Sequence, residues 1–262
     1  MTLLLIELLL IIPLLWVTGF LIATDFAVPS KKPGPFRRVL VIFPHADDET
    51  IGCGGVLHRL TANGCAITLV ILTRGERGGI MAGNGDRLKE IRLREAQKAS
   101  AILGISRFIQ EDFGDSKLSQ RKPELMGFLD EIIQQEKPEL LMTYDLAGFY
   151  GHADHITCSE VLTELKQTRF PDLPLWYVTF PRRVLGMVKA PADLEIDSHF
   201  REKQALPTHK IFIGTNVGAK IRAWYTYKSQ HASLTKNVGR LLPPWFLFSM
   251  VLFEYFAEVN EA

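Results

Sequence analysis

Short runs of apolar residues alternate along the chain with longer stretches of helical periodicity, and this alternation limits the fold most narrowly. The runs VLVIF at 39–43 and AITLVILT at 66–73 are apolar on both faces, which is typical of buried parallel strands. Gly104 predicts the end of a helix. Further elements are expected as strands near 107–110, 139–145, 175–180 and 210–215, and as helices at 49–62, 86–103, 123–135, 154–166 and 217–230. The order predicts a right-handed, Rossmann-like three-layer α/β/α sandwich around a mostly parallel sheet.

The composition is that of an ordinary globular protein, with 47% hydrophobic and 23% charged residues in a chain of 262. Thirty Lys and Arg stand against 29 Asp and Glu, without a long run of one sign. This balance disfavours a nucleic-acid partner. Cys53, Cys65 and Cys158 are odd in number and lack CxxC spacing, so they predict neither a disulfide framework nor a zinc knuckle.

The amino end differs from the rest, because residues 3–23 are almost all apolar. A helix of that length crosses a bilayer core of about 30 Å, so we expect a single-pass transmembrane helix, with a membrane anchor over 1–28 and a linker over 29–37. Four basic residues in or next to that linker predict that the domain at 38–262 faces the cytoplasm. A cleaved signal peptide and a buried helix are the alternatives.

Two polar clusters follow predicted strands at their carboxyl ends, where ligands bind in such folds. Each joins imidazole to carboxylate: Pro44-His45-Ala46-Asp47-Asp48-Glu49 and Tyr150-Gly151-His152-Ala153-Asp154-His155. These side chains suit zinc, and three protein ligands leave one position open for catalysis. Capping of the following helices is the structural alternative for the carboxylates. HExxH and GxSxG are absent, which removes the commonest zincin and serine-hydrolase interpretations.

The two clusters resemble the signatures of the LmbE/PIG-L superfamily of zinc-dependent N-deacetylases. PHADDETIGCGG at 44–55 is similar to its PHPDDE motif, and YGHADH at 150–155 to its GHxDH motif. Lesser similarities lie in LTRGERGG at 72–79, Arg92 to Glu95, Asp115, Ser229-Gln230 and Glu254 to Phe256. The chain departs from the family at Ala46, usually proline, and at Tyr227, often histidine.

The resemblance implies a site that holds one Zn²⁺, with another divalent metal as the alternative. It implies three metal ligands, His45, Asp48 and His155. Asp47 is the implied general base, and His152 the group beside the substrate carbonyl, which we expect Asp154 to hold protonated. Weaker candidates for substrate contacts are Arg74, Glu76, Arg92 and Tyr150.

The predicted activity is zinc-dependent hydrolysis of the acetamide of an N-acetylglucosamine-containing conjugate, which releases acetate and a free amine. The conjugate can be lipid-linked, given the predicted anchor. A metal-dependent phosphoesterase and a metal-retaining binding protein without activity are the alternatives. The aromatic segment at 241–256 is expected either to pack on the domain or to rest on the membrane.

Overall fold

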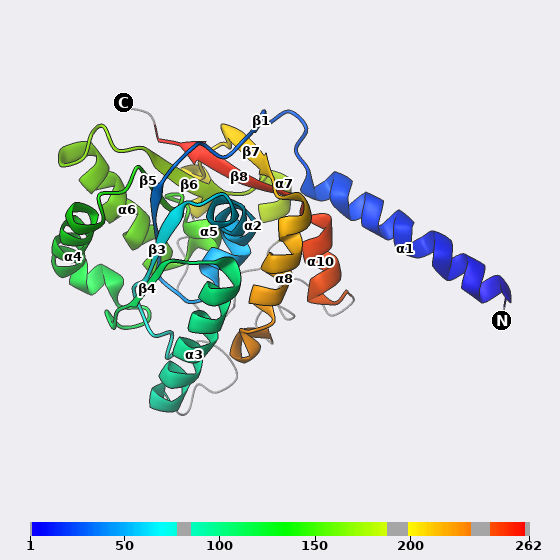
Figure 1. Cartoon of the computed structure of the whole chain (residues 1–262), viewed down its shortest axis with the longest axis horizontal. Helices are drawn as coiled ribbons and strands as arrows, with labels where there is room; N and C mark the ends of the chain where they lie inside the picture. Colours follow the sequence, from blue (N-terminus) through cyan, green and yellow to red (C-terminus); the bar gives the residue numbers. More distant parts are fainter. Residues whose placement is uncertain (1, 78–84, 188–198, 232–241, 260–262) are drawn as a thin grey trace.

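An eight-stranded sheet in the order β1-β7-β8-β6-β5-β2-β3-β4 forms the centre of the molecule (Figure 1). The computed structural model describes residues 2–77, 85–187, 199–231 and 242–259. The strands are β1 Ser30–Lys31, β2 Arg38–Phe43, β3 Ala66–Ile71, β4 Arg107–Gln110, β5 Leu140–Tyr144, β6 Leu175–Thr179, β7 His209–Phe212 and β8 Phe253–Glu258. The helices are α1 Thr2–Ala23, α2 Asp48–Ala62, α3 Gly85–Leu103, α4 Lys122–Glu136, α5 Gly148–Gly151, α6 Ala153–Thr168, α7 Arg182–Leu185, α8 Val217–Trp224 and α10 Pro244–Met250.

The predicted α/β fold with a mostly parallel sheet is confirmed. All the strand pairs are parallel except those of β8, which runs antiparallel between β6 and β7. The sheet is therefore mixed. Two strands were not predicted: β8, and the two-residue strand β1, which pairs Ser30–Lys31 of the expected linker with Lys210 and Ile211 of β7.

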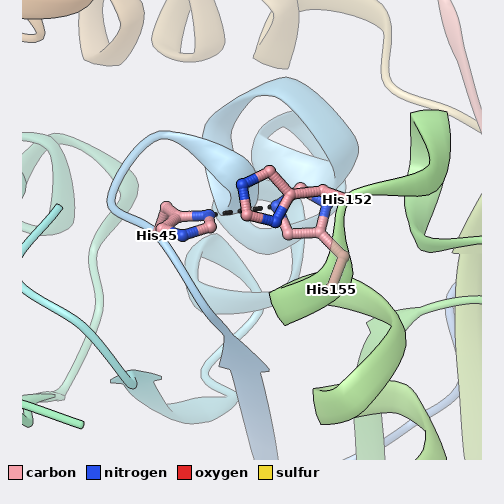
Figure 2. Close-up of side chains that lie close together, drawn as sticks. All are labelled: His45, His152 and His155. Carbon is pink, nitrogen blue, oxygen red and sulfur yellow. Dashed lines mark hydrogen bonds between the residues drawn. The ribbon is translucent and has the colours of Figure 1, made fainter. Parts of the chain in front are cut away.

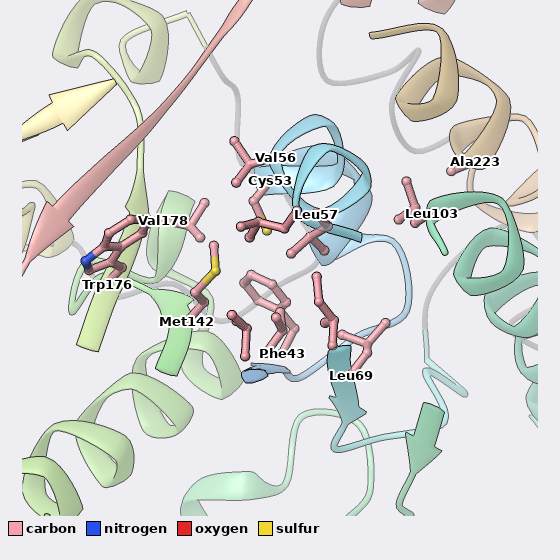
Figure 3. Close-up of a cluster of buried hydrophobic side chains, with 14 of the residues drawn as sticks. Phe43, Cys53, Val56, Leu57, Leu69, Leu103, Met142, Trp176, Val178 and Ala223 are labelled. Atoms are coloured by element: carbon pink, nitrogen blue, oxygen red, sulfur yellow. The ribbon is translucent and has the colours of Figure 1, made fainter. Parts of the chain in front are cut away.

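Apolar cores cover both faces of the sheet, as runs apolar on both faces require. Along β2, Val41 and Phe43 point to the face covered by α2, α3 and α8, whereas Leu40 and Ile42 point to the face covered by α4 and α6. Figure 3 shows the first of these cores, where α2 packs over Phe43.

The aromatic segment near the carboxyl end packs mainly on the domain. Phe246 and Phe248 of α10 are buried, and Phe256 of β8 is fully enclosed. Trp245 is the exception, since half of its surface is exposed. Leu241 lies outside the described residues.

Helix α2 is kinked at Cys53, whose φ of −145° is not helical. The kink frees two amides, and the Glu254 carboxylate accepts hydrogen bonds from both, Gly55 N at 2.9 Å and Val56 N at 2.7 Å. Lys220 Nζ completes the arrangement by donating to Glu254 Oε1 at 2.6 Å and to the Ile51 carbonyl at 2.9 Å. This buried ion pair joins α8 and β8 to the helix that begins at the candidate site.

Replacing Lys220 with methionine is expected to lower the free energy of unfolding by about 3–5 kcal/mol, because it leaves the Glu254 charge buried without its cation. Denaturant unfolding followed by circular dichroism measures the loss. Glu90→Gln is the matched control, since its pair with Arg94 is solvent-exposed and is worth about 0.5 kcal/mol or less. Equal stability of the two variants would contradict the role given to the buried pair.

Helix α1 continues through Pro13 and extends away from the rest of the domain (Figure 1). Its second half contacts the domain at α7 and α10, where Trp16 Nε1 donates to Ser249 Oγ at 3.1 Å. Its apolar side chains Leu14 and Leu21 are 66% and 50% exposed. Within the described part of the chain, no helix is long and apolar enough to cross a bilayer, so the expected transmembrane span is not confirmed.

Candidate functional site

The two predicted polar loops meet at the carboxyl ends of neighbouring parallel strands, β2 and β5. In the first loop, the Asp48 carboxylate accepts a hydrogen bond from His45 N at 2.9 Å and closes the turn. Asp47 has a φ of 112°, a left-handed conformation that costs about 1–3 kcal/mol for a residue other than glycine. Such strain persists where the surrounding structure enforces it, and Arg92 does so by donating from Nη2 to the Ala46 carbonyl at 2.9 Å.

The second loop carries two histidines on and beside the first turn of α6. His152 caps this helix, because its Nδ1 accepts a hydrogen bond from Asp154 N at 3.1 Å. His155 follows on the same turn, with its ring 4.8 Å from that of His152. Figure 2 shows His45 facing both rings from the β2 side. All three histidines are buried.

Three ligand atoms from the two loops form a triangle of the size that a zinc ion requires. His45 Nδ1 lies 3.1 Å from His155 Nε2, Asp48 Oδ2 lies 3.4 Å from His155 Nε2, and Asp48 Oδ2 lies 3.7 Å from His45 Nδ1. Tetrahedral ligands at about 2.0–2.1 Å from zinc are about 3.3 Å apart. Within the described ranges, two further groups could hold an ion: His45 with His152 and His155, and His45 with Asp115 and Asp154.

Hydrogen bonds on the far side of each ring leave the correct nitrogen free for a metal. His155 Nδ1 lies 3.1 Å from the Gly148 carbonyl, which can only accept, so this nitrogen carries the proton and Nε2 is free. His45 Nε2 lies 3.2 Å from Asp154 Oδ2 and 3.3 Å from Asp115 Oδ1, which keep a proton on Nε2, so Nδ1 is the nitrogen that would give up its proton to a metal. Asp115 and Asp154 therefore orient His45 from behind.

The charge of the cluster also fits a cation. Burial alone lowers the pKa of His45, but hydrogen bonds to Asp115 and Asp154 and the charge of Asp48 hold it well above the usual histidine range. Burial opposes ionisation of Asp115 as well, and its contact with His45 nevertheless lowers its pKa well below that of a free carboxyl. Carboxylates gathered out of water in this way need positive charge beside them, which a divalent ion supplies.

The structure corrects the expected partnership of His152 and Asp154. The Asp154 carboxylate lies against His45 and accepts from Ser116 N and Leu118 N, whereas the hydrogen bond of His152 is made with the Asp154 backbone amide. Burial, together with the charges of His45 and His155, lowers the pKa of His152 to about 3. Because its Nδ1 accepts a hydrogen bond, His152 is a neutral imidazole whose Nε2 carries the proton.

Asp47 stands apart from the ligand triangle. It is half-buried and lines the cavity described below. Burial raises the pKa of its carboxyl to about 8, Arg92 opposes the rise, and the charges of Asp48 and Glu49 add to it. A carboxyl that titrates close to neutrality can both accept and release a proton during catalysis.

Tyr227, where the family often has histidine, is fully buried and supports the first loop from beneath. Its hydroxyl donates to Glu49 Oε1 at 2.7 Å, and Glu49 Oε2 in turn accepts from Asp47 N at 3.1 Å. Sequence reasoning gave Glu49 and Tyr227 no role in the site. The departure from the family pattern was the one signal that pointed to this position.

The four weaker candidates separate into different roles. Tyr150 lines the cavity, with its ring 5.6 Å from that of His155. Glu76 accepts from Asp115 N at 3.1 Å and Arg92 supports Ala46, so both act behind the site. Arg74 instead pairs with Asp112 at 3.6 Å on the surface. Residues 78 and 79 of the same loop lie outside the described residues.

A cavity of about 240 Å³ adjoins the site. Asp47, Asp48 and Tyr150 line it on the side of the two loops. The remaining wall comes from segments far away in the sequence, including α7, α8, α10, β8 and Ala23 at the end of α1. A ligand bound beside Asp47 therefore extends toward elements from both ends of the chain.

The chain is similar to known proteins in sequence and in fold. The PIG-L family profile, described as GlcNAc-PI de-N-acetylase, matches residues 40–166, which contain both loops. A 1D-myo-inositol 2-acetamido-2-deoxy-alpha-D-glucopyranoside deacetylase of Catenulispora acidiphila is 33% identical over 159 residues, which are 51% of this chain and 49% of that protein. The diacetylchitobiose deacetylase of Thermococcus kodakarensis is 29% identical over 226 residues, 84% of this chain and 79% of that protein.

The chain spans about half the length of the Catenulispora relative. Among solved structures, the N,N'-diacetylchitobiose deacetylase of Pyrococcus horikoshii has a TM-score of 0.65 at 20% identity and covers 86% of this chain and 85% of its own. At that identity the match supports the fold. The family profile covers residues 40–166, which hold both histidine-carboxylate loops at adjoining strand ends, and over this part the chain is similar to the PIG-L family of de-N-acetylases.

Proposed function

We propose that the protein hydrolyses the acetamide of an N-acetylglucosamine-containing conjugate and releases acetate and the free amine. The observation that carries the proposal is the triangle of His45 Nδ1, Asp48 Oδ2 and His155 Nε2, with edges of 3.1–3.7 Å, beside a carboxyl that is not part of it. The Catenulispora and Thermococcus relatives are named as deacetylases of sugars that carry the same amide.

The ligand set proposed for one Zn²⁺ is His45, Asp48 and His155. Zinc bound there supplies Lewis-acid polarisation of the amide carbonyl and makes water a better nucleophile near neutral pH. The protein holds the ligands in place through Asp115, Asp154 and the Gly148 carbonyl, which fix the two ring orientations. A site ordered in this way before substrate arrives loses little free energy to rearrangement.

Asp47 is the proposed general base and acid. It takes a proton from the attacking water and delivers it to the amide nitrogen as the C–N bond breaks. Its raised pKa lets the carboxyl hold that proton between the two steps. His152 acts as a neutral donor, because its protonated Nε2 can hydrogen-bond the carbonyl oxygen while negative charge develops on it.

Acetate release tests the activity directly. The zinc-loaded full chain is incubated with glycosides of N-acetylglucosamine and, separately, with their phosphorylated counterparts. We expect acetate and a new primary amine in equal amounts. Phosphate release without acetate would favour a phosphoesterase, and metal-dependent binding without any product would favour a binding protein; either result refutes the proposed activity.

We also propose that α1 attaches the protein to a membrane, with the domain on the cytoplasmic side. The exposed apolar side chains of the helix support the attachment, among them Ile12 and Leu14, which are 51% and 66% exposed. Lys31 and Lys32, just past the helix, support the orientation. The benefit is proximity, because a membrane-borne substrate is concentrated near the site without a new contact there.

Deletion of residues 1–28 is expected to move the protein from the membrane fraction to the soluble fraction. Because the deletion also removes Asp25, whose amide donates to the Tyr255 hydroxyl, a milder variant with Ile12→Lys and Leu14→Lys serves as a second test. Both should keep acetate release from a water-soluble glycoside. A mature protein that begins after Ala27, or a domain cleaved by protease only from outside intact cells, would contradict the proposal.

A further inference from the structure

The cavity beside Asp47 has walls that are mostly apolar. Its volume of about 240 Å³ equals that of roughly eight water molecules at about 30 Å³ each. The apolar wall residues are Ala23, Ile51, Phe149, Phe180, Pro181, Val184, Leu247, Phe248, Val251 and Phe253. Pockets lined in this way bind the apolar part of a ligand, while a few polar groups fix its orientation.

Four of the five polar side chains in the wall away from Asp47 already have partners in the protein, whereas the fifth, Trp224, has a buried indole Nε1 for which the described residues offer no partner. Lys220 and Glu254 are paired at 2.6 Å. Gln230 Nε2 donates to Ser229 Oγ at 2.9 Å, and the Tyr255 hydroxyl accepts from Asp25 N at 2.7 Å. A ligand group rich in hydroxyls would therefore lose several bonds to water and meet one unpaired donor, the Trp224 indole, whereas a hydrocarbon has no such bonds to lose.

An aromatic wall is held in place at the boundary between the site and the cavity. Phe149 lies in the loop after β5 and adopts a φ of 64°, a conformation rarely seen in a bulky residue. Its ring lies 4.6 Å from that of Phe180 and 5.5 Å from that of Tyr144. The strained backbone thus keeps an apolar ring beside the reacting groups.

We propose that this cavity binds a hydrocarbon segment of the substrate's aglycone, attached to the sugar that carries the amide. The inference rests on the proposed function, because it takes the sugar to lie against Asp47 and Asp48. The names of the two relatives, for inositol and chitobiose conjugates, and of the family profile, for GlcNAc-PI, do not assign a ligand group to this cavity.

The position of α1 favours the aglycone over the acyl group as the occupant. Ala23, the last residue of α1, lines the cavity, and the exposed apolar side chains of the same helix precede it. A substrate held in a membrane carries its hydrocarbon on the aglycone, so the chain would reach the site from the side of α1. A long N-acyl group is the competing occupant.

Binding of product glycosides tests the assignment without turnover. Dissociation constants of the methyl, butyl and hexyl glycosides of glucosamine are measured by calorimetry with the zinc-loaded full chain. These short chains stay dissolved as single molecules. We expect about fourfold tighter binding for each methylene that enters the cavity, and about tenfold or more between methyl and hexyl.

Two substitutions place the effect in the cavity. Leu247→Trp fills the cavity from α10, and the dissociation constants of the hexyl and methyl glycosides should then be equal. Val184→Trp fills it from α7 and should have the same effect, which guards against a folding defect in one variant. Leu206→Trp is the matched control, because Leu206 is 62% exposed and lies outside the cavity wall; it should keep the difference between the two constants.

The outcomes separate the inference from the proposed function. Equal constants for the methyl and hexyl glycosides would overturn the aglycone subsite even if acetate release is normal. A gain that follows the length of the N-acyl chain instead would assign the cavity to the acyl group and overturn it as well. A chain-length effect on binding without any acetate release would uphold the subsite and refute the activity.

Discussion

Replacing His155 with alanine is expected to remove the metal from the purified protein. His155 supplies one corner of the proposed ligand triangle, and its ring is already oriented by the Gly148 carbonyl at 3.1 Å. Two remaining ligands hold zinc far more weakly than three. Metal analysis after dialysis should fall from about one zinc per chain to a small fraction of that, and His45→Ala should behave alike.

The control is His58→Ala, because His58 lies on α2 but contacts Asn216 at 2.8 Å rather than the candidate site. It should retain about one zinc per chain. Full metal content in both His45→Ala and His155→Ala would refute the ligand set. Loss in His152→Ala together with retention in Asp48→Asn would instead select the group of three histidines.

Asp47→Asn is expected to lower kcat by about 10²- to 10⁴-fold while the zinc content stays unchanged. The amide has the same shape as the carboxyl but cannot take the proton from water. Asp47 lies outside the ligand triangle, so its replacement removes no proposed metal ligand. Acetate release and metal analysis on the same sample measure both quantities.

Asp112→Asn is the matched control for this variant. Asp112 is a carboxylate on the surface, where it lies 3.6 Å from Arg74 and 2.9 Å from Lys89. Its kcat should equal that of the native protein. If Asp47→Asn loses its zinc, or keeps full turnover, then Asp47 is not the general base.

Local pattern predicts most of the sheet. The strand predicted at 107–110 agrees with β4. The two apolar runs agree with β2 and β3, because a strand that is buried on both faces has apolar residues at consecutive positions. Strand β8 was not predicted, because Phe253–Glu258 follows the aromatic helix α10 and pairs with strands that precede it by more than 40 residues. The shared apolar character concealed the change from helix to strand.

The meeting of the two loops could be anticipated, whereas the contacts within the site could not. Parallel strands place their carboxyl ends on one edge, so His45 and His155 come together once β2 and β5 are neighbours. The partner of Asp154 depends on how α6 enters the site, and its first turn directs that carboxylate to His45 rather than to His152. Such directions are set by tertiary packing, which spacing in the sequence does not specify.

The position of β8 has a consequence for how the protein is made. It lies inside the sheet, between β6 and β7, although its residues are the last strand to be synthesised. Until then, β6 has an open edge, and β7 with β1 lacks its link to the other strands. Open strand edges on a nascent chain are templates for pairing with other chains, so we expect folding of this protein to depend on chaperones that shield that edge until β8 has been synthesised.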